Sequence, residues 1–394
     1  QIHLYVYSLS VLSLSWSYLE VTTSGRYNDS IQVYAAGAVE AAVSSELIYK
    51  HWMKTLMGYC SPFTFESGFC HRLKDYITTN LQWVRQQIEE HPHCPYWHQV
   101  FAESVSANVL NHQLLPGNKD LLVSHDAWNI YQAMLRILKK YQFAYRVSPT
   151  DSDPIPGGTQ AFSSYPGSIF SGDDFYILST GLVTLETSIN NSNPALWKFV
   201  QPTGAVMEWL RNIVANRLAA SGKEWAEIFS KHNRYNNQWM IVEYRHFTPG
   251  MTETKEQLFT VLEQLPGLVP LYEYPFPTPL FFCRYNNFKN DPLSWCEGCD
   301  PPANGENTIS ARSDLNPANG TYPFGALKQK PHGGTDMKVT SYGLWREFGF
   351  LAASGPTWDQ IPAFQWSSSP YSDLMHIGHP DTWAFAPVNV TWST

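Results

Sequence analysis

The chain has 394 residues, of which 15% are charged and 15% aromatic, and its formal net charge is −8. This length allows a substantial buried core, and the charged fraction is well below the roughly 25% of an average soluble domain. Lys and Arg are scattered singly along the chain, which argues against nucleic acid as a partner, and no stretch reaches the roughly 18 uninterrupted apolar residues of a membrane span.

The first half of the chain predicts several helices. Apolar residues recur at helical spacing from Asn28 to about Met57, where Asn28, Asp29 or Ser30 can cap the start. A second helix is expected over about 79–90. A third is expected from Ala127 to about Tyr141, directly after the strand LLVS.

Strands and helices then alternate in groups. Residues 161–189 are rich in β-formers broken by glycines, which predicts an antiparallel meander, and 205–233 predicts helices with a capping box at Ser221 and Glu224. QWMIVEYRHF predicts a strand, and the last third predicts loops with short strands. This order favours one α+β domain in which helices pack on a mostly antiparallel sheet.

Cysteines and glycosylation triplets point to an oxidising compartment. Cys60 and Cys70 bracket a loop of the size that one disulfide closes, and a second local disulfide is expected between Cys296 and Cys299. Cys94 and Cys283 remain as free thiols or a third bridge. N-linked glycans are expected at the four N-x-S/T sites, Asn28, Asn190, Asn319 and Asn389.

No cofactor or metal is expected. The one candidate set of metal ligands is HPHC at 91–94 with His98, whose spacing matches no common zinc site. A redox role for the C-x-x-C pair is disfavoured because Asp300-Pro301-Pro302 follows it instead of a helix.

Long segments of the chain resemble the phospholipase B-like family of lysosomal glycoproteins. They include GRYNDSIQVYAAGAVEAAVSSELIYKHWM, LLPGNKDLLVSHDAWNIYQAMLRILKKY, FSSYPGSIFSGDDFYILSTGLVTLET and AASGPTWDQIPAFQWSSSP. The resemblance implies an αββα sandwich of the N-terminal nucleophile hydrolase type, within the α+β class. It leaves 1–15 unmatched and makes 16–394 a single domain, with 16–107 like the N-terminal fragment and 108–394 like the C-terminal fragment of the processed family.

The family's catalytic group is missing from this chain. The resemblance implies internal cleavage that exposes a cysteine, whose thiol attacks an acyl carbonyl while its own α-amine serves as base. In the family's register that cysteine falls on Asn108, and no cysteine lies between Cys94 and Cys283. Ser104 and Ser106 are out of register, so a serine substitute is disfavoured.

Two segments break the resemblance. One covers about 101–113 and the other about 268–282, and in each a longer family segment is absent between well-matched flanks. Such breaks are typical of skipped exons or of an error in the gene model, which sequencing the transcript would decide. A further possibility is that the shortened chain fails to fold, because missing segments leave sheet edges unpaired.

Four pocket residues are carried over from the family. The resemblance implies that His125 bonds near the thiol, that Trp128 walls the pocket, that Thr187 is a polar pocket residue, and that Asn237 or its neighbour Asn236 supplies an oxyanion-hole amide. Structural roles are expected for a further set: His332, Asp336, Arg312 and Asp314.

The expected activity is hydrolysis of acyl ester or amide bonds of lipids, in the lysosome lumen or outside the cell. The alternative is a non-catalytic lumenal glycoprotein that binds a lipid or acyl amide without cleaving it. An N-terminal cysteine in the purified protein distinguishes the two.

Overall fold

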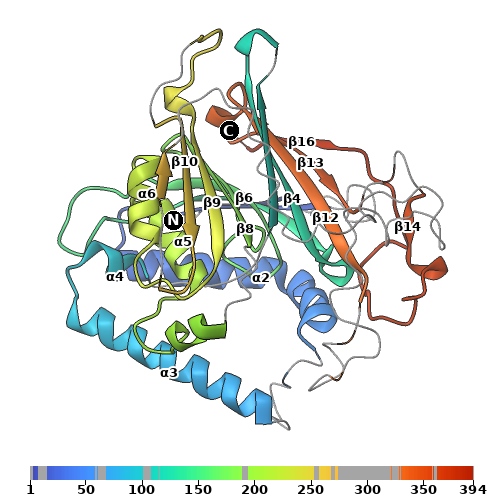
Figure 1. Ribbon diagram of the computed structural model, residues 1–394, viewed down its shortest axis with the longest axis horizontal. Coiled ribbons are helices and arrows are strands. Elements are labelled where there is room, and N and C mark those ends of the chain that lie inside the picture. The colour runs from blue at the N-terminus through green and yellow to red at the C-terminus, as the bar shows by residue number, and fades with distance from the viewer. Residues whose placement is uncertain are drawn as a thin grey trace.

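Two stacked β-sheets with helices on one outer side form the molecule, as Figure 1 shows for the computed structural model. The residues that the structure describes are 3–7, 16–57, 60, 68–100, 108–114, 116–188, 194–252, 257–267, 271–273, 321, 328, 330–356, 358 and 362–393.

The larger sheet has nine strands in the order β1-β2-β5-β6-β7-β8-β9-β10-β11. All neighbours are antiparallel except β2 and β5, which are parallel. The strands are β1 (His3–Tyr7), β2 (Trp16–Thr22), β5 (Arg136–Gln142), β6 (Thr159–Ser164), β7 (Phe175–Leu178), β8 (Leu182–Ser188), β9 (Asn237–Glu243), β10 (Phe259–Gln264) and β11 (Leu271–Glu273).

The smaller sheet has five antiparallel strands in the order β16-β13-β12-β4-β3. They are β3 (Asn108–Leu114), β4 (Leu121–Ile130), β12 (His332–Ser341), β13 (Phe350–Ser354) and β16 (Val388–Val390). A two-stranded sheet joins β14 (Phe364–Gln365) to β15 (Thr382–Trp383).

The α-helices are α2 (Asp29–Thr55), α3 (Gly68–Glu90), α4 (Pro95–Gln99), α5 (Glu208–Leu218) and α6 (Gly222–Phe229). The 3₁₀ turns are η1 (Pro116–Asn118), η2 (Tyr131–Ala133), η3 (Pro194–Phe199), η4 (Tyr244–His246), η7 (Trp345–Glu347) and η8 (Trp366–Ser368). Asn28 caps α2 by accepting from the Ile31 N–H, and Ser221 caps α6 by accepting from the Glu224 N–H, both as the sequence predicts.

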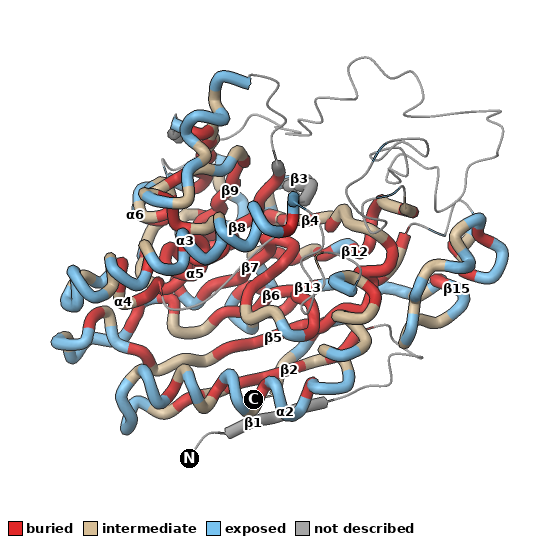
Figure 2. The backbone as a smooth tube through the Cα atoms, turned by 90° about the horizontal axis from the view of Figure 1, so that it is seen from below, coloured by how far each residue is buried: buried red, intermediate tan, exposed pale blue. Residues whose placement is uncertain are grey.

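Two apolar cores separate three layers. One core lies between the sheets, where Val123 of β4 meets Val183 of β8 and Phe350 of β13. The other lies between the nine-stranded sheet and the helices, where Trp239 of β9 meets Trp225 of α6. The central strands are therefore buried on both faces, as Figure 2 shows.

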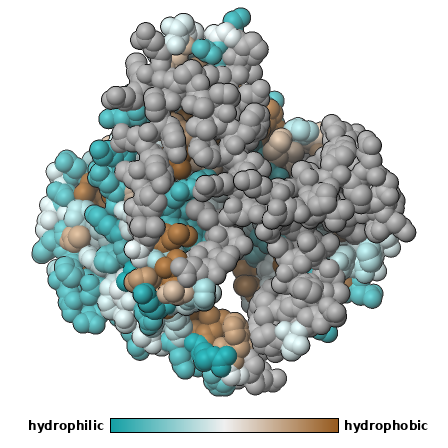
Figure 3. Space-filling model, in the orientation of Figure 1, coloured by the Kyte–Doolittle hydropathy of each residue, from teal (hydrophilic) through white to brown (hydrophobic). Residues whose placement is uncertain are grey.

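The outer sides of the two sheets differ. Helices cover the nine-stranded sheet, and hydrophilic residues with small separate hydrophobic patches prevail on that part of the surface (Figure 3). Among the described residues no α-helix covers the outer face of the five-stranded sheet, where Met337 and Leu351 are exposed. The fold belongs to the α+β class, and the described residues form one helical layer and the two sheets of the αββα sandwich that the resemblance implies.

The helix expected over 127–141 is absent. Residues 127–130 continue β4, a 3₁₀ turn follows, and 136–142 form β5. The helical spacing of Ile130, Met134, Ile137 and Tyr141 is misleading because β5 is buried on both faces, so its apolar residues do not alternate. Two other elements differ from the sequence prediction. Helix α3 begins at Gly68 rather than near Thr79, and the last third, expected to hold short strands, contains the ten-residue strand β12.

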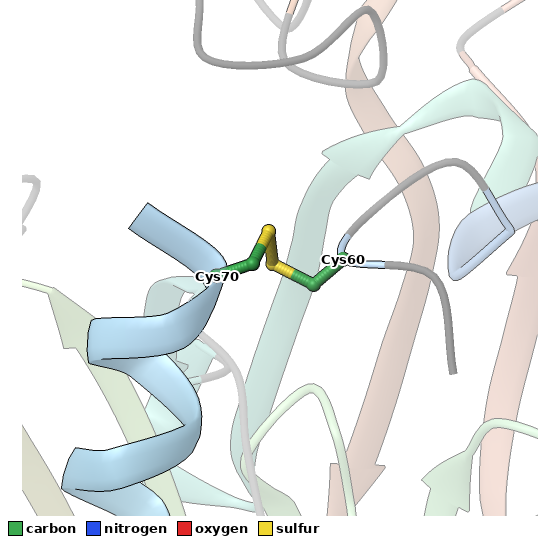
Figure 4. Close-up of a disulfide and its surroundings, with 2 residues drawn as sticks. All are labelled: Cys60 and Cys70. Carbon is green, nitrogen blue, oxygen red and sulfur yellow. A yellow bond between two sulfur atoms is a disulfide. The ribbon is translucent and has the colours of Figure 1, made fainter. Parts of the chain in front are cut away.

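A disulfide joins the start of α3 to the segment after α2, as predicted. Cys60 and Cys70 are bonded, with 5.3 Å between their Cα atoms (Figure 4), whereas Cys94 is free. Cys283, Cys296 and Cys299 lie outside the described residues.

We expect alkylation of the unfolded, unreduced protein to label Cys94 and to leave Cys60 and Cys70 unlabelled. Replacing Cys60 and Cys70 with serine should lower the free energy of unfolding by about 2–3 kcal/mol, because the bridge closes a loop of about ten residues in the unfolded chain. Cys94→Ser is the matched control. Labelling of Cys60 or Cys70 without reductant would contradict the bridge.

Two predicted glycosylation sites lie on described surface. Asn28 and Asn389 are exposed, and the Asn28 cap uses Oδ1, which leaves Nδ2 for a glycan. Asn190 and Asn319 lie outside the described residues.

Candidate functional site

His125 lies between the two sheets near one end of the sandwich. On β4 it follows Leu121 and Val123 on the inner face, and it pairs in register with Lys338 of β12. It is 1% exposed, and its ring packs against Phe175 of β7 with 6.0 Å between centroids. The face of β4 that points between the sheets therefore changes from apolar to polar at His125.

The imidazole of His125 is held neutral. Burial lowers its pKa well below the usual value, and the positive charges of Lys338 and Arg136 add to the shift. The Glu186 backbone opposes the shift weakly, but no described residue offers either ring nitrogen a hydrogen bond of ordinary geometry. A neutral imidazole can accept or donate one proton, which suits a group beside a reacting thiol.

Four charged side chains form a buried network beside His125. Arg136 of β5 pairs with Asp173 and with Asp336 of β12, whose Oδ2 lies 2.6 Å from the Arg136 Nη1. Lys338 pairs with Asp336 and lies 3.5 Å from Asp173. All four side chains are fully buried, so the charged network consists of two cations and two anions that neutralise each other away from water.

Neighbouring groups complete the charged network. Ser163 donates to the Asp173 Oδ2 at 2.8 Å, and the Arg136 guanidinium lies over the Tyr165 ring at 4.2 Å. Burial lowers the pKa of Lys338 to about 8, an effect that Asp336 opposes. The charged network joins β5 of the larger sheet to β12 of the smaller one and so fixes the spacing of the two sheets at the His125 end.

Trp128 lies on the other face of β4. Successive residues of a strand face opposite ways, and the alternating burial of β4 puts Trp128 with Asp126 on the outer face. The Trp128 indole N–H donates to the Asp126 Oδ2 at 3.1 Å, and burial together with Asp336 raises the pKa of Asp126 to about 7. The structure does not bring Trp128 and His125 together.

Thr187 and Asn237 lie on adjacent strands at the His125 end of the larger sheet. Thr187 of β8 is two residues beyond Leu185, which pairs with Phe175, and strand alternation puts it on the inner face with Leu185. Asn237 begins β9 and shares a face with Trp239, on the helix side. Its amide is fully buried, and neither amide atom has a hydrogen-bond partner among the described residues.

Position 108 begins β3. Its backbone pairs with Ala127, which lies two residues along β4 from His125, the partner of Lys338. Ser104, Ser106, Arg312 and Asp314 lie outside the described residues, whereas Asp336, expected only to support turn structure, belongs to the charged network. Sequence reasoning missed Arg136, Asp173 and Lys338.

No group of three or more potential metal ligands is assembled among the described residues. His98, one of the candidate ligands, instead contacts Asp29 at 2.9 Å. Within the same part of the chain, no helix combines the length and the apolar character needed to cross a membrane.

A sequence model described as phospholipase B matches residues 4–111, 106–273 and 280–390, and so nearly the whole chain. This chain belongs to the phospholipase B-like family. The match begins inside the segment 1–15 that sequence inspection left unmatched. Its junctions, at 106–111 and 273–280, fall within the two breaks found in the sequence.

Relatives in the family cover almost the whole chain. Phospholipase B-like 2 of Homo sapiens is 46% identical over 497 aligned residues, which cover 97% of this chain and 84% of the relative. Phospholipase B-like 2 of Mus musculus is 43% identical with the same coverage, and that of Caenorhabditis elegans is 32% identical, covering 98% of this chain and 84% of the relative. The aligned span exceeds the 394 residues of the chain, so the relatives contain segments without a counterpart here.

Solved structures offer only a remote likeness. Two mutant forms of conjugated bile acid hydrolase from Clostridium perfringens are 9% and 10% identical, cover 73% of this chain and 97% of their own, and give TM-scores of 0.33 and 0.30. None of the positions above is assigned from them.

Proposed function

We propose that this chain carries the scaffold of a hydrolase for acyl ester or amide bonds of lipids, and that turnover requires a cysteine-containing segment that the 394-residue form lacks. The observation that supports this most is the place of position 108. It begins β3, and its backbone partner Ala127 lies two residues along β4 from the buried His125. A thiol there would lie at the polar end of the inter-sheet space.

The proposed reaction needs groups that this end of the sandwich offers. A thiol at the start of β3 would attack the acyl carbonyl, with its own α-amine as base. His125, neutral because it is buried, would orient the thiol or pass a proton, and Thr187 would contact the substrate. Trp128 and Asn237 keep proposed roles as pocket wall and oxyanion donor on the strength of family resemblance alone.

A non-catalytic lumenal glycoprotein is the second candidate. The absence of any cysteine between Cys94 and Cys283 favours it, because the α-amine and His125 cannot replace a nucleophile. Such a protein would bind a lipid or acyl amide without cleaving it. For both candidates we propose N-glycans on the four asparagines, a second disulfide between Cys296 and Cys299, and residence in the lysosome lumen or outside the cell.

Reducing intact-mass measurement with N-terminal sequencing of the native protein separates the candidates. Two chains, of which the larger begins at a cysteine upstream of Leu114-Leu115-Pro116-Gly117, would support the hydrolase. One uncut chain of 44.8 kDa plus glycans would support the non-catalytic glycoprotein.

In a form that carries the family's cysteine segment, we expect His125→Ala to lower turnover of a chromogenic acyl ester by about a hundredfold or more, in the range of a lost acid–base group. The unfolding midpoint should remain that of a folded protein. His91→Ala, at an exposed position, is the control and should leave turnover unchanged. Full turnover by the His125 variant would remove this residue from the site.

A further inference from the structure

A cavity lies on the helical side of the molecule, away from the inter-sheet space. It has a volume of about 510 Å³ and is enclosed by the start of α2, the end of α3, α4 and the turn at 145–149. Figure 1 shows α4 beside the start of α2. None of the residues of the candidate site or of the charged network lines it.

Arg217 in the wall of this cavity is a buried cation that no described carboxylate contacts directly. Arg217 is 6% exposed, and its guanidinium lies over the Tyr145 ring, 4.9 Å from the ring centroid. Nη1 donates to the Gln99 Oε1 at 3.4 Å, whereas Nε has no partner among the described residues. Within that part of the chain no carboxylate lies within ion-pair distance of it, although a buried charge is costly unless it is paired.

Other charges of the cavity compensate Arg217 only in part: burial lowers the pKa of its guanidinium, and the charge of Asp29 opposes this shift from a distance. Arg26 and Arg146 lie at the exposed rim, and Asp29 is the single carboxylate among the lining residues. The Asp29 Oδ2 already accepts from the Arg146 backbone N–H at 3.0 Å and contacts the His98 Nε2 at 2.9 Å. Three arginines and one carboxylate, which already has partners, therefore line the cavity.

Much of the remaining wall is apolar and is formed by Tyr27, Val33, Ile88, Pro92, Trp97 and Pro149, beside the polar side chains of Asn28, Ser30, His91 and His98. A cavity of this size, with apolar walls and a few convergent polar groups, is typical of a small-molecule site. Guanidinium groups pair best with planar carboxylates and with phosphates, to which they donate two parallel hydrogen bonds.

We propose that this cavity binds a small organic anion, namely a carboxylate or phosphate ester with an apolar ring or chain. The anionic group lies on Arg217 and the apolar body lies against Tyr27 and Ile88. The ligand neutralises the buried guanidinium and fills the apolar part of the cavity. This site is independent of the proposed hydrolase activity, since it shares no residue with the inter-sheet site.

Calorimetric titration tests the proposal with four probes: phenyl phosphate, phenylacetate, inorganic phosphate and benzyl alcohol. All proteins carry Ser30→Ala, which removes the glycosylation triplet at Asn28 and keeps its cap. We expect phenyl phosphate or phenylacetate to bind with a dissociation constant below about 1 mM, and whichever binds more tightly identifies the anionic group. Inorganic phosphate and benzyl alcohol should each bind at least tenfold more weakly.

Variants locate the binding. Arg217→Lys keeps the positive charge but cannot donate two parallel hydrogen bonds to one anionic group, so it should weaken binding of the anionic probe about tenfold. Arg26→Gln with Arg146→Gln removes two positive charges from the cavity rim and should also weaken binding of the anionic probe, because these charges attract the anion to the cavity. Both positions are exposed, so this variant can be measured even if the Arg217 variant does not fold. Arg346→Gln, at an exposed arginine outside the cavity, should bind as the parent does. Equal binding of benzyl alcohol, or unchanged binding in the Arg26 and Arg146 double variant, would overturn the proposal.

Discussion

Replacing Arg136 with methionine is expected to lower the free energy of unfolding by about 3–5 kcal/mol, the range measured when one partner of a buried ion pair is removed. Arg136 is fully buried between Asp173 and Asp336. Without it, two carboxylates would face only Lys338, which leaves one uncompensated negative charge between the sheets. Urea unfolding followed by tryptophan fluorescence at pH 7 measures the change.

Glu46→Gln is the control for the Arg136 prediction. Glu46 is the exposed partner of Lys50 on α2, one turn apart, and its loss should leave the unfolding midpoint unchanged. The double variant Arg136→Met with Asp336→Asn should be less destabilised than the sum of the two single variants, because the second change removes a charge that the first leaves unpaired. A loss for Arg136→Met no larger than for Glu46→Gln would contradict the role of the charged network.

A large pH effect is expected where the end of α2 meets the C-terminal segment. The Lys54 Nζ lies 2.6 Å from the His379 Nε2, within hydrogen-bond distance. Burial lowers the pKa of His51 to about 3 and that of His379 well below its usual value, and it lowers the pKa of Lys54 to about 6. Burial, helped by the charge of Lys54, therefore holds both histidines in their neutral form.

The sign of the pH effect on stability follows from which state, folded or unfolded, takes up protons. As pH falls below about 6.5, the unfolded chain protonates His51 and His379 while the folded chain does not, so stability falls with pH. Lys54 also lowers the stability of the fold as pH falls, but at higher pH, between its usual pKa of 10.5 and its pKa of about 6 in the folded chain. Each histidine contributes at most about 1.4 kcal/mol per pH unit, or about 5 kcal/mol for the two between pH 6.5 and 4.5.

The test compares variants, because buried carboxylates act in the opposite direction. The pKa of Asp126 is raised to about 7, so its contribution to stability grows as pH falls. The double variant His51→Gln with His379→Gln keeps an acceptor for Lys54 and removes both titrations. Relative to the parent, it should gain about 5 kcal/mol in unfolding free energy on going from pH 7 to 4.5, whereas the exposed control His93→Gln should gain nothing. A pH-independent difference would refute this account.

Local sequence signals predicted the elements that are bounded by clear caps and turns. The helix from Asp29 and the meander of β6, β7 and β8 follow from caps, turns and periodicity. β5 was mistaken for a helix because its lysines, which suggest a solvated face, are paired inside: Lys139 with Glu40 of α2, and Lys140 with Glu20 of β2. Such pairing depends on residues about a hundred positions away.

The same limit applies to the site. His125 was found through its family resemblance, but the alternation Asp336-Met337-Lys338-Val339 predicts a strand with its charges in water. The structure reverses this: Lys338 is fully buried while Met337 is 40% exposed. Opposite charges two residues apart on one strand are the only local sign of the reversal, and their partners Arg136 and Asp173 lie on other elements.

The topology of the two sheets has a consequence for how fast the chain folds. The parallel pair β2 and β5 joins residues about 120 positions apart, and the β4–β12 pair joins Ala127 to Thr335, 208 positions apart. Ser393 bonds Glu20 across 373 positions. Contacts so distant in sequence form only after large loops have closed, so the sandwich assembles slowly while its helices form early. The Cys60–Cys70 bridge closes only a short loop and does not bring any of these distant segments together. Newly made chains therefore expose apolar strands for long periods.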